Sequence, residues 1–174
     1  MKNFLVIIDM QTDFVDGALG TKEALTAAEY AKDVIRDFDG ELFVTYDTHS
    51  EGYLETAEGR KLPIKHCIDG TVGHELHPVI KKALEGKHYT EVKKYTFGSI
   101  KLPKILLAAS GGDDFSITLI GLCTDICVIS NALILKANFP NNRISVIEKA
   151  CAGVTPESHD AAITTMKMCQ IDII

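Results

Sequence analysis

The pattern of apolar and polar residues along the chain predicts strands that alternate with helices. Short apolar segments with the length of buried strands are predicted at Phe4–Ile8, Leu42–Tyr46, Ile117–Ile120 and Ile144–Ile147, with a shorter one at Thr90–Lys93 and a closing sixth at Ile171–Ile174. Runs of this length and composition are typical of strands that are buried on both faces of a sheet.

Between these strands, apolar residues recur three and four positions apart, which predicts helices. The expected helices cover Glu23–Phe38, Glu75–Glu85, Ile100–Ala109 and a segment from Thr124 to about Ala137, with a last helix opened by Thr155 and Pro156 as N-cap and first helical residue. Alternating strands and helices imply right-handed crossovers. We therefore expect an α/β fold with a single, doubly wound domain over residues 1–174. Its mostly parallel, six-stranded sheet would carry helices on both faces.

Composition and charge narrow the class of protein. The chain has 174 residues, of which 46% are hydrophobic, and this suits one compact domain with a substantial core. Its 24 acidic and 18 basic residues give a net charge of −6, and the longest basic runs are the pairs Lys81-Lys82 and Lys93-Lys94. A nucleic-acid partner is therefore not expected.

The N-terminus and the cysteines indicate a cellular compartment. Asn3–Ile8 enters directly into a strand, without a signal peptide or an apolar run long enough to span a bilayer. Five cysteines follow no disulfide or zinc-ribbon spacing, which suits reduced thiols. We expect a cytoplasmic protein with a small-molecule or protein partner and no contact with a membrane.

The segment Ser116–Val128 runs from a buried strand through Gly121 into a helix. If Thr124 is the N-cap of that helix, Cys127 is its third residue. Free backbone N–H groups and the helix dipole would there favour a thiolate, so Cys127 is a candidate nucleophile. For a lone cysteine, a buried structural role is the commoner alternative.

Several polar residues follow directly on predicted strands. Asp9 follows the first strand, Asp47 and His49 the second, Lys94 the third and Cys127 the fourth. Ligands of parallel α/β sheets bind beyond the carboxyl ends of the strands. We therefore expect an acid, metal-ligand types, a base and a thiol to meet at one edge of the sheet.

Taken together, five motifs resemble those of the isochorismatase-like cysteine hydrolases, and in particular the nicotinamidase-like members. The motifs are Ile7–Phe14, Tyr46–His49, His66–Pro78, Lys94 and Gly121–Val128. The resemblance extends over nearly the whole chain. It implies the same α/β fold and an amide hydrolase that works through a cysteine.

The resemblance implies that Asp9, Lys94 and Cys127 form a catalytic triad. A lysine ammonium lowers the pKa of a neighbouring thiol, so that a thiolate and a protonated aspartate can coexist. Lys93 is the competing lysine, since strand alternation points the two neighbours to opposite faces, and the resemblance favours Lys94. The resemblance also implies a cis peptide bond before Cys123, and an oxyanion hole formed by the backbone N–H groups of Cys123 and Cys127.

A second group of residues has the donor types of a metal site. Asp47 and His49 lie on one side of an extended segment, and together with His66 they offer nitrogen and oxygen ligands that suit Zn²⁺, Mn²⁺ or Fe²⁺. By resemblance, Glu58 is the fourth ligand of one divalent ion, most simply zinc, with Glu55 as the alternative. Ordinary roles as loop residues stay open.

The reaction implied by the resemblance is hydrolysis of nicotinamide to nicotinate and ammonia through a thioester on Cys127. Phe14 would form one aromatic wall for this small-molecule amide, and Phe97 the second, because the chain has no tryptophan. The alternative substrates are another amide, a carbamoyl or ureido compound, and isochorismate. From a different functional class, the alternative is a catalytically silent binding protein with the same fold. A homo-oligomer, either a dimer or a tetramer, is also expected by resemblance.

Overall fold

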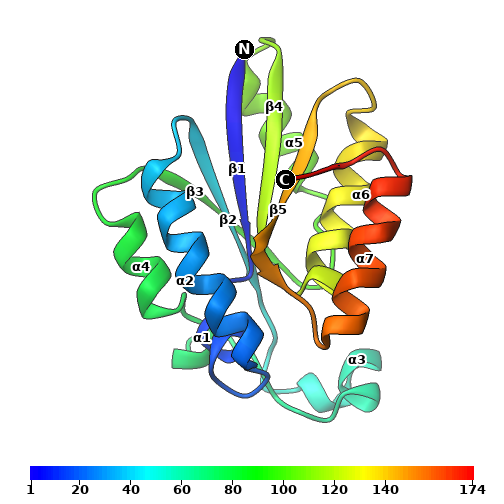
Figure 1. Ribbon diagram of the computed structural model, residues 1–174. Helices are drawn as coiled ribbons and strands as arrows, with labels where there is room; N and C mark the ends of the chain where they lie inside the picture. Colours follow the sequence, from blue (N-terminus) through cyan, green and yellow to red (C-terminus); the bar gives the residue numbers. More distant parts are fainter.

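The computed structural model describes residues 1–174 and has one sheet of six parallel strands at its centre (Figure 1). The strands lie in the order β3-β2-β1-β4-β5-β6. Their bounds are β1 (Lys2–Ile8), β2 (Glu41–Asp47), β3 (Tyr89–Lys94), β4 (Phe115–Leu122), β5 (Ile144–Ala152) and β6 (Asp172–Ile173). Every neighbouring pair is parallel. The order reverses beside β1, between β1 and β4, as in doubly wound sheets.

Helices cover both faces of this sheet (Figure 1). On one face lie α2 (Lys22–Asp37) and α4 (Pro78–Leu84). On the other lie α5 (Leu102–Ser110), α6 (Ile129–Asn138) and α7 (Pro156–Met168). The fold class predicted from the sequence is therefore confirmed. None of the helices has the length and the unbroken apolar sequence needed to cross a bilayer.

Strand β1 shows why apolar and polar residues do not alternate along the central strands. Phe4, Val6 and Ile8 face the core under α5, α6 and α7, whereas Leu5 and Ile7 face the core under α2 and α4. All five side chains are fully buried. A strand between two layers of helices must be apolar on both sides.

Two predicted helix starts are wrong. The helix expected over Glu75–Glu85 begins at Pro78, because His77 is its N-cap and accepts a hydrogen bond from the Val79 N–H. Thr124 does not cap the central helix either, since Cys123 occupies the N-cap position without a side-chain cap.

The turn Thr124–Val128 is π-helical, with the Val128 N–H donating to the Cys123 carbonyl at 3.0 Å. The Thr124 hydroxyl instead bonds His159 Nδ1 of α7 at 2.8 Å. Cys127 is therefore the fourth residue of a wide turn and not the third of an α-helix. The N-cap predicted for α7 is correct, because the Thr155 side chain accepts from the Ser158 N–H.

The end of β4 needs a glycine. Gly121 has a φ of +127°, and a Cβ there would clash with the carbonyl oxygen of Ile8 on β1. The peptide bond between Leu122 and Cys123 is cis, as expected from the resemblance. Strand β4 therefore ends next to the end of β1. Asp9, which follows β1, and the turn that contains Cys127, which follows β4, start close to each other.

The long segment between β2 and α4 has structure of its own. It contains the short helices η1 (Tyr53–Glu55), α3 (Ala57–Lys61) and η2 (Val72–His74). The His49 N–H donates to the Cys67 carbonyl and the Asp69 N–H to the His49 carbonyl, each at 2.9 Å, which ties the segment's second half to its beginning. Figure 1 shows α3 beyond the carboxyl ends of the strands.

Candidate active site

Three side chains from three strand ends meet in the interior. Asp9 follows β1, Lys94 is the last residue of β3, and Cys127 lies in the turn after β4. Lys94 Nζ is 2.6 Å from Asp9 Oδ2 and 3.5 Å from Cys127 Sγ. All three residues are at most 4% exposed. The structure therefore brings together the acid, base and thiol that the sequence indicated.

The competing lysine lies elsewhere. Lys93 Nζ is on the surface, 3.0 Å from Asp69 Oδ1, and its side chain is 45% exposed. Lys94 points the other way and is buried, because neighbouring residues of a strand face opposite sides.

The two carboxylate oxygens of Asp9 have different surroundings. Oδ1 accepts a hydrogen bond from the Thr45 hydroxyl at 2.6 Å. Oδ2 lies 2.6 Å from Lys94 Nζ, so the ammonium is its partner.

Burial and neighbouring charges together set the pKa values of this cluster. Burial raises the pKa of Asp9 above its ordinary 3.8, although Lys94 acts to lower it. Burial acts to lower the pKa of Lys94, but Asp9, Cys127 and Asp47 outweigh it and raise that pKa, so the ammonium persists.

The expectation of a low-pKa thiolate at Cys127 is wrong. Burial and then Asp9 raise the pKa of the Cys127 thiol well above its ordinary 9.0, and Lys94 offsets this only in part. When the sulfur reacts, its proton must pass to a base, and the Asp9 carboxylate belongs to the same cluster.

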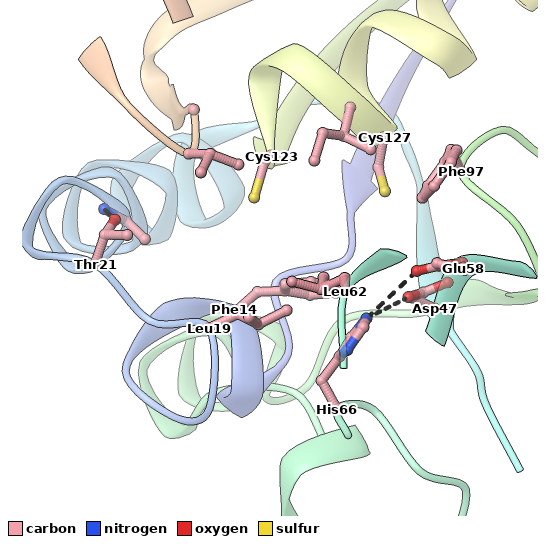
Figure 2. Close-up of a pocket in the computed structure, with 14 residues that line it drawn as sticks. Phe14, Leu19, Thr21, Asp47, Glu58, Leu62, His66, Phe97, Cys123 and Cys127 are labelled. Carbon is pink, nitrogen blue, oxygen red and sulfur yellow. Dashed lines mark hydrogen bonds and ion pairs between the residues drawn. The ribbon is translucent and has the colours of Figure 1, made fainter. Parts of the chain in front are cut away.

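A second cluster combines two imidazoles and two carboxylates. One ligand atom each of Asp47, His49, Glu58 and His66 lies within 4.8 Å of the others. His49 Nε2 is 2.9 Å from Asp47 Oδ2, and His66 Nε2 is 3.7 Å from both Asp47 Oδ2 and Glu58 Oε1 (Figure 2). Glu55, the alternative carboxylate, is exposed on η1 and outside this cluster.

The donors of this cluster fit a divalent metal ion. The Nδ1–H of His66 donates to the Ile64 carbonyl at 2.8 Å, which leaves the lone pair of Nε2 directed at the carboxylates. Two nitrogen and two oxygen donors in a mostly buried position suit zinc or a similar cation. Asp47, His49, Glu58 and His66 could therefore hold one ion.

Asp47 connects the two clusters. Its Oδ1 accepts from Lys94 Nζ at 3.1 Å, while its Oδ2 faces His49 and His66. Lys94 therefore lies between two carboxylates, one from each cluster. A change of charge at Asp47 consequently acts directly on the Lys94 ammonium, which in turn contacts the Cys127 sulfur.

Gln11, which was not predicted as a functional residue, holds Asp47 in place. Gln11 Nε2 donates to the carbonyls of Asp47 and His74 at 2.9 and 2.8 Å, and its Oε1 accepts from the Asp47 N–H at 2.8 Å. The side chain is fully buried. A polar amide beside an apolar strand was the only signal in the sequence, and it does not say which backbone the amide binds.

Both clusters open into a pocket of about 240 Å³. Phe14 and Phe97 line it, as predicted, together with the thiols of Cys123 and Cys127 (Figure 2). The Phe14 ring lies 5.4 Å from that of His66. Among the lining residues are two carboxylates and no lysine or arginine, and most of the others are apolar. The pocket is therefore mostly apolar, and its acidic side chains belong to the ligand cluster.

Comparison with known proteins agrees with this geometry. Residues 3–174 match the family model described as the isochorismatase domain. The chain is 31% identical over 181 residues to a Bacillus subtilis protein described as the uncharacterized isochorismatase family protein PncA, covering 94% of this chain and 93% of the relative.

Solved structures are similar over their full length. The pyrazinamidase/nicotinamidase of Streptococcus mutans has a TM-score of 0.83 and 27% identity, and the nicotinamidase/pyrazinamidase PncA of Bacillus subtilis has 0.81 and 25%, each covering 99% of both chains. The pyrazinamidase of Pyrococcus horikoshii in complex with zinc has a TM-score of 0.82 at 23% identity, covering 100% of this chain and 99% of that one. At that identity the likeness shows the fold alone.

Proposed function

Because the chain belongs to the isochorismatase family of hydrolases, we propose that it is a metal-assisted cysteine amidohydrolase and that nicotinamide is its substrate. One observation carries the proposal. A buried lysine contacts both an aspartate, at 2.6 Å, and a cysteine, at 3.5 Å, and the cysteine lines a pocket next to a cluster of metal-ligand types. This combination suits acyl transfer with proton shuttling.

In the proposed first step, Cys127 Sγ attacks the carboxamide carbon while its proton passes to Asp9. The raised pKa of Asp9 supports this role, because a buried carboxylate is a stronger base than an exposed one. Lys94 stays charged between Asp9 and Asp47 and stabilises the negative charge that moves through the cluster. Asp9 then gives the proton to the leaving nitrogen, and ammonia departs.

The oxyanion of the tetrahedral intermediate needs hydrogen-bond donors. We assign this role to the backbone N–H groups of Cys123 and Cys127, at the start of the π-helical turn. In the second step, water attacks the thioester, Asp9 accepts the water's proton, and Cys127 leaves and regains a proton. The products are nicotinate and ammonia.

The metal site completes the proposed substrate binding. Asp47, His49, Glu58 and His66 would hold the ion, for which we propose zinc because of the mixed nitrogen and oxygen donors. Once bound, it would supply a Lewis acid that binds the ring nitrogen. The zinc complex of the Pyrococcus horikoshii pyrazinamidase is consistent with this choice. Phe14 and Phe97 would form the walls around the ring.

The size of the pocket is compatible with nicotinamide. A cavity of about 150 Å³ binds benzene, so nine non-hydrogen atoms in place of six need roughly 225 Å³. The pocket has about 240 Å³. Isochorismate and N-carbamoyl amino acids carry a carboxylate, for which the lining offers no lysine or arginine.

An ammonia-release assay tests the proposal. Nicotinamide, pyrazinamide and an N-carbamoyl amino acid are offered to the metal-loaded wild type and to Cys127→Ala. We expect ammonia from the first two substrates with the wild type only. Release from none of the three, or release that survives Cys127→Ala, would overturn the proposal.

The homo-oligomer expected from the sequence is also part of the proposal. Strand β6 forms the edge of the sheet, and Ile174 next to it is 58% exposed. An edge strand can pair with a second copy. If the whole protein sediments at its monomer mass of 19.0 kDa, the proposed homo-oligomer is contradicted.

A further inference from the structure

A buried amide on α6 joins the cysteine turn to the aromatic wall of the pocket. Asn131 Nδ2 donates to the carbonyls of Cys127 at 2.8 Å and Phe97 at 3.2 Å, and its Oδ1 accepts from the Ser99 N–H at 2.9 Å. The side chain is fully buried on a helix face that packs into an apolar core. All of these partners are backbone groups, so the contacts fix main-chain positions.

The loop between β3 and α5 is held at several neighbouring residues. Lys94 Nζ donates to the Thr96 carbonyl at 3.1 Å, just before the residues that Asn131 binds. Gly98 packs closely on α6, since a Cβ there would lie 2.5 Å from Ile134 Cδ1 and 3.4 Å from Ser130 Cβ. Phe97 is 42% exposed, but its backbone is anchored on both sides.

Phe97 and Cys127 lie at the same end of the pocket. Figure 2 shows the Phe97 ring beside the Cys127 sulfur, above Glu58 and Asp47. A substrate ring against Phe97 therefore reaches the sulfur in an orientation that depends on the spacing of these two backbone segments. Asn131 bonds the backbone of both segments, whereas Lys94 bonds the backbone of the loop and the sulfur of Cys127.

We propose that Asn131 is a positioning residue that fixes the aromatic wall relative to the nucleophile. This inference rests on the proposed function, because it takes Cys127 as the reacting group and Phe97 as a wall for the substrate ring. Loss of Asn131 then has two separable effects. The wall shifts, which weakens substrate binding, and the Cys127 turn loosens, which slows the chemical step.

A double-mutant cycle with Asn131→Ala and Phe97→Ala tests this inference. Alone, each substitution is expected to raise KM for nicotinamide about tenfold, and Asn131→Ala also lowers kcat about tenfold. With Phe97 already replaced, Asn131→Ala should leave KM within about twofold and still lower kcat. A purely structural role would not make the KM effect depend on Phe97.

Gly98→Ala is the second variant and protects the test against misfolding of Asn131→Ala. Its added methyl group meets Ile134 Cδ1 of α6 and shifts the loop slightly while the Asn131 side chain is kept, so KM should rise about threefold with kcat unchanged, again only while Phe97 is present. Asn138→Ala is the matched control, because this exposed asparagine of the same helix bonds only the Ile134 carbonyl. It should change neither constant.

Alkylation of Cys127 by iodoacetamide gives a readout that does not need turnover. Asn131→Ala should accelerate it about threefold or more, because the turn opens more often, whereas Asn138→Ala should not. A KM effect that is additive with Phe97→Ala, or unchanged KM and alkylation in Asn131→Ala, would overturn the inference. A wild type that hydrolyses no carboxamide would overturn the proposed function instead, and alkylation would still decide whether Asn131 holds Cys127.

Discussion

The two clusters of the pocket differ in what holds them. Asp9, Lys94 and Cys127 are attached to the ends of three strands, and each is at most 4% exposed. Of the metal-ligand types, His49, Glu58 and His66 come from the long segment between β2 and α4, and the Glu58 side chain is 22% exposed. The first cluster is therefore a fixed part of the sheet, whereas three of the four residues of the second depend on a loop.

This difference separates their expected roles. Charge and proton movement need a buried and rigid environment, which the strand ends supply. An ion and a substrate need a route in from solvent, which a cluster built partly on a loop can offer. Changes in the first cluster should therefore act on kcat, and changes in the second on metal affinity and KM.

The largest effect is expected for Cys127→Ala. If Cys127 is the nucleophile, kcat for nicotinamide should fall about 10⁴-fold or more, because removal of a nucleophile leaves only the binding contribution. The control is Cys123→Ala, which removes the other pocket thiol and should cost less than about tenfold. Comparable losses in the two variants would contradict the assignment.

Asp9→Asn should lower kcat by about 10²–10⁴-fold, the usual contribution of a general base. Burial raises the pKa of Asp9 above 3.8, and only its ionised form accepts a proton. The wild-type kcat/KM should therefore fall as the pH drops through a midpoint above that value. The pH profile of Asp9→Asn should lack this acidic limb, and an unchanged limb would assign it to another group.

In the ligand cluster, His66→Ala should weaken metal binding by about 10–100-fold or more and raise KM, with a smaller effect on kcat of the metal-saturated protein. Titration with zinc followed by competition with a chelator measures the affinity. His88→Ala, which removes an exposed histidine outside the cluster, is the control. Equal metal affinity in the two variants would contradict a site at His66.

The smallest effect on the reaction is expected for Gln11→Leu, which acts first on stability. This change leaves the Asp47 N–H and two carbonyls without their partner, each at a cost of about 1–3 kcal/mol in the free energy of unfolding if no water enters. Metal affinity should fall as well, because Asp47 is then less firmly placed. Gln170→Leu, at an exposed position, should change neither the melting temperature nor the affinity.

Much of the fold could be predicted because the central strands are buried on both sides. A run such as Phe4–Ile8 has few alternatives, and Thr155-Pro156 marks the start of α7. Strand β5 was predicted too short, since its middle residues Glu148 and Lys149 are polar and interrupt the apolar pattern. Its continuation to Ala152 depends on pairing with β4, which involves residues distant in the sequence.

The convergence at the strand ends could also be predicted, because parallel strands bring their carboxyl ends to one edge. The acidity of Cys127 could not, since it depends on how completely the neighbouring layers exclude water. The choice between Glu55 and Glu58 required the path of the loop. Gln11 and Asn131 were missed because they bind backbone groups, which carry no signature in the sequence.

Mass spectrometry of the enzyme quenched in acid during turnover of nicotinamide tests the central claim most directly. The account predicts a nicotinoyl group bound as a thioester to the peptide that contains Cys127, and its disappearance when hydroxylamine is added. An adduct on another residue, or turnover without any trapped acyl group in the wild type and in variants slowed at the second step, would contradict Cys127 as the nucleophile.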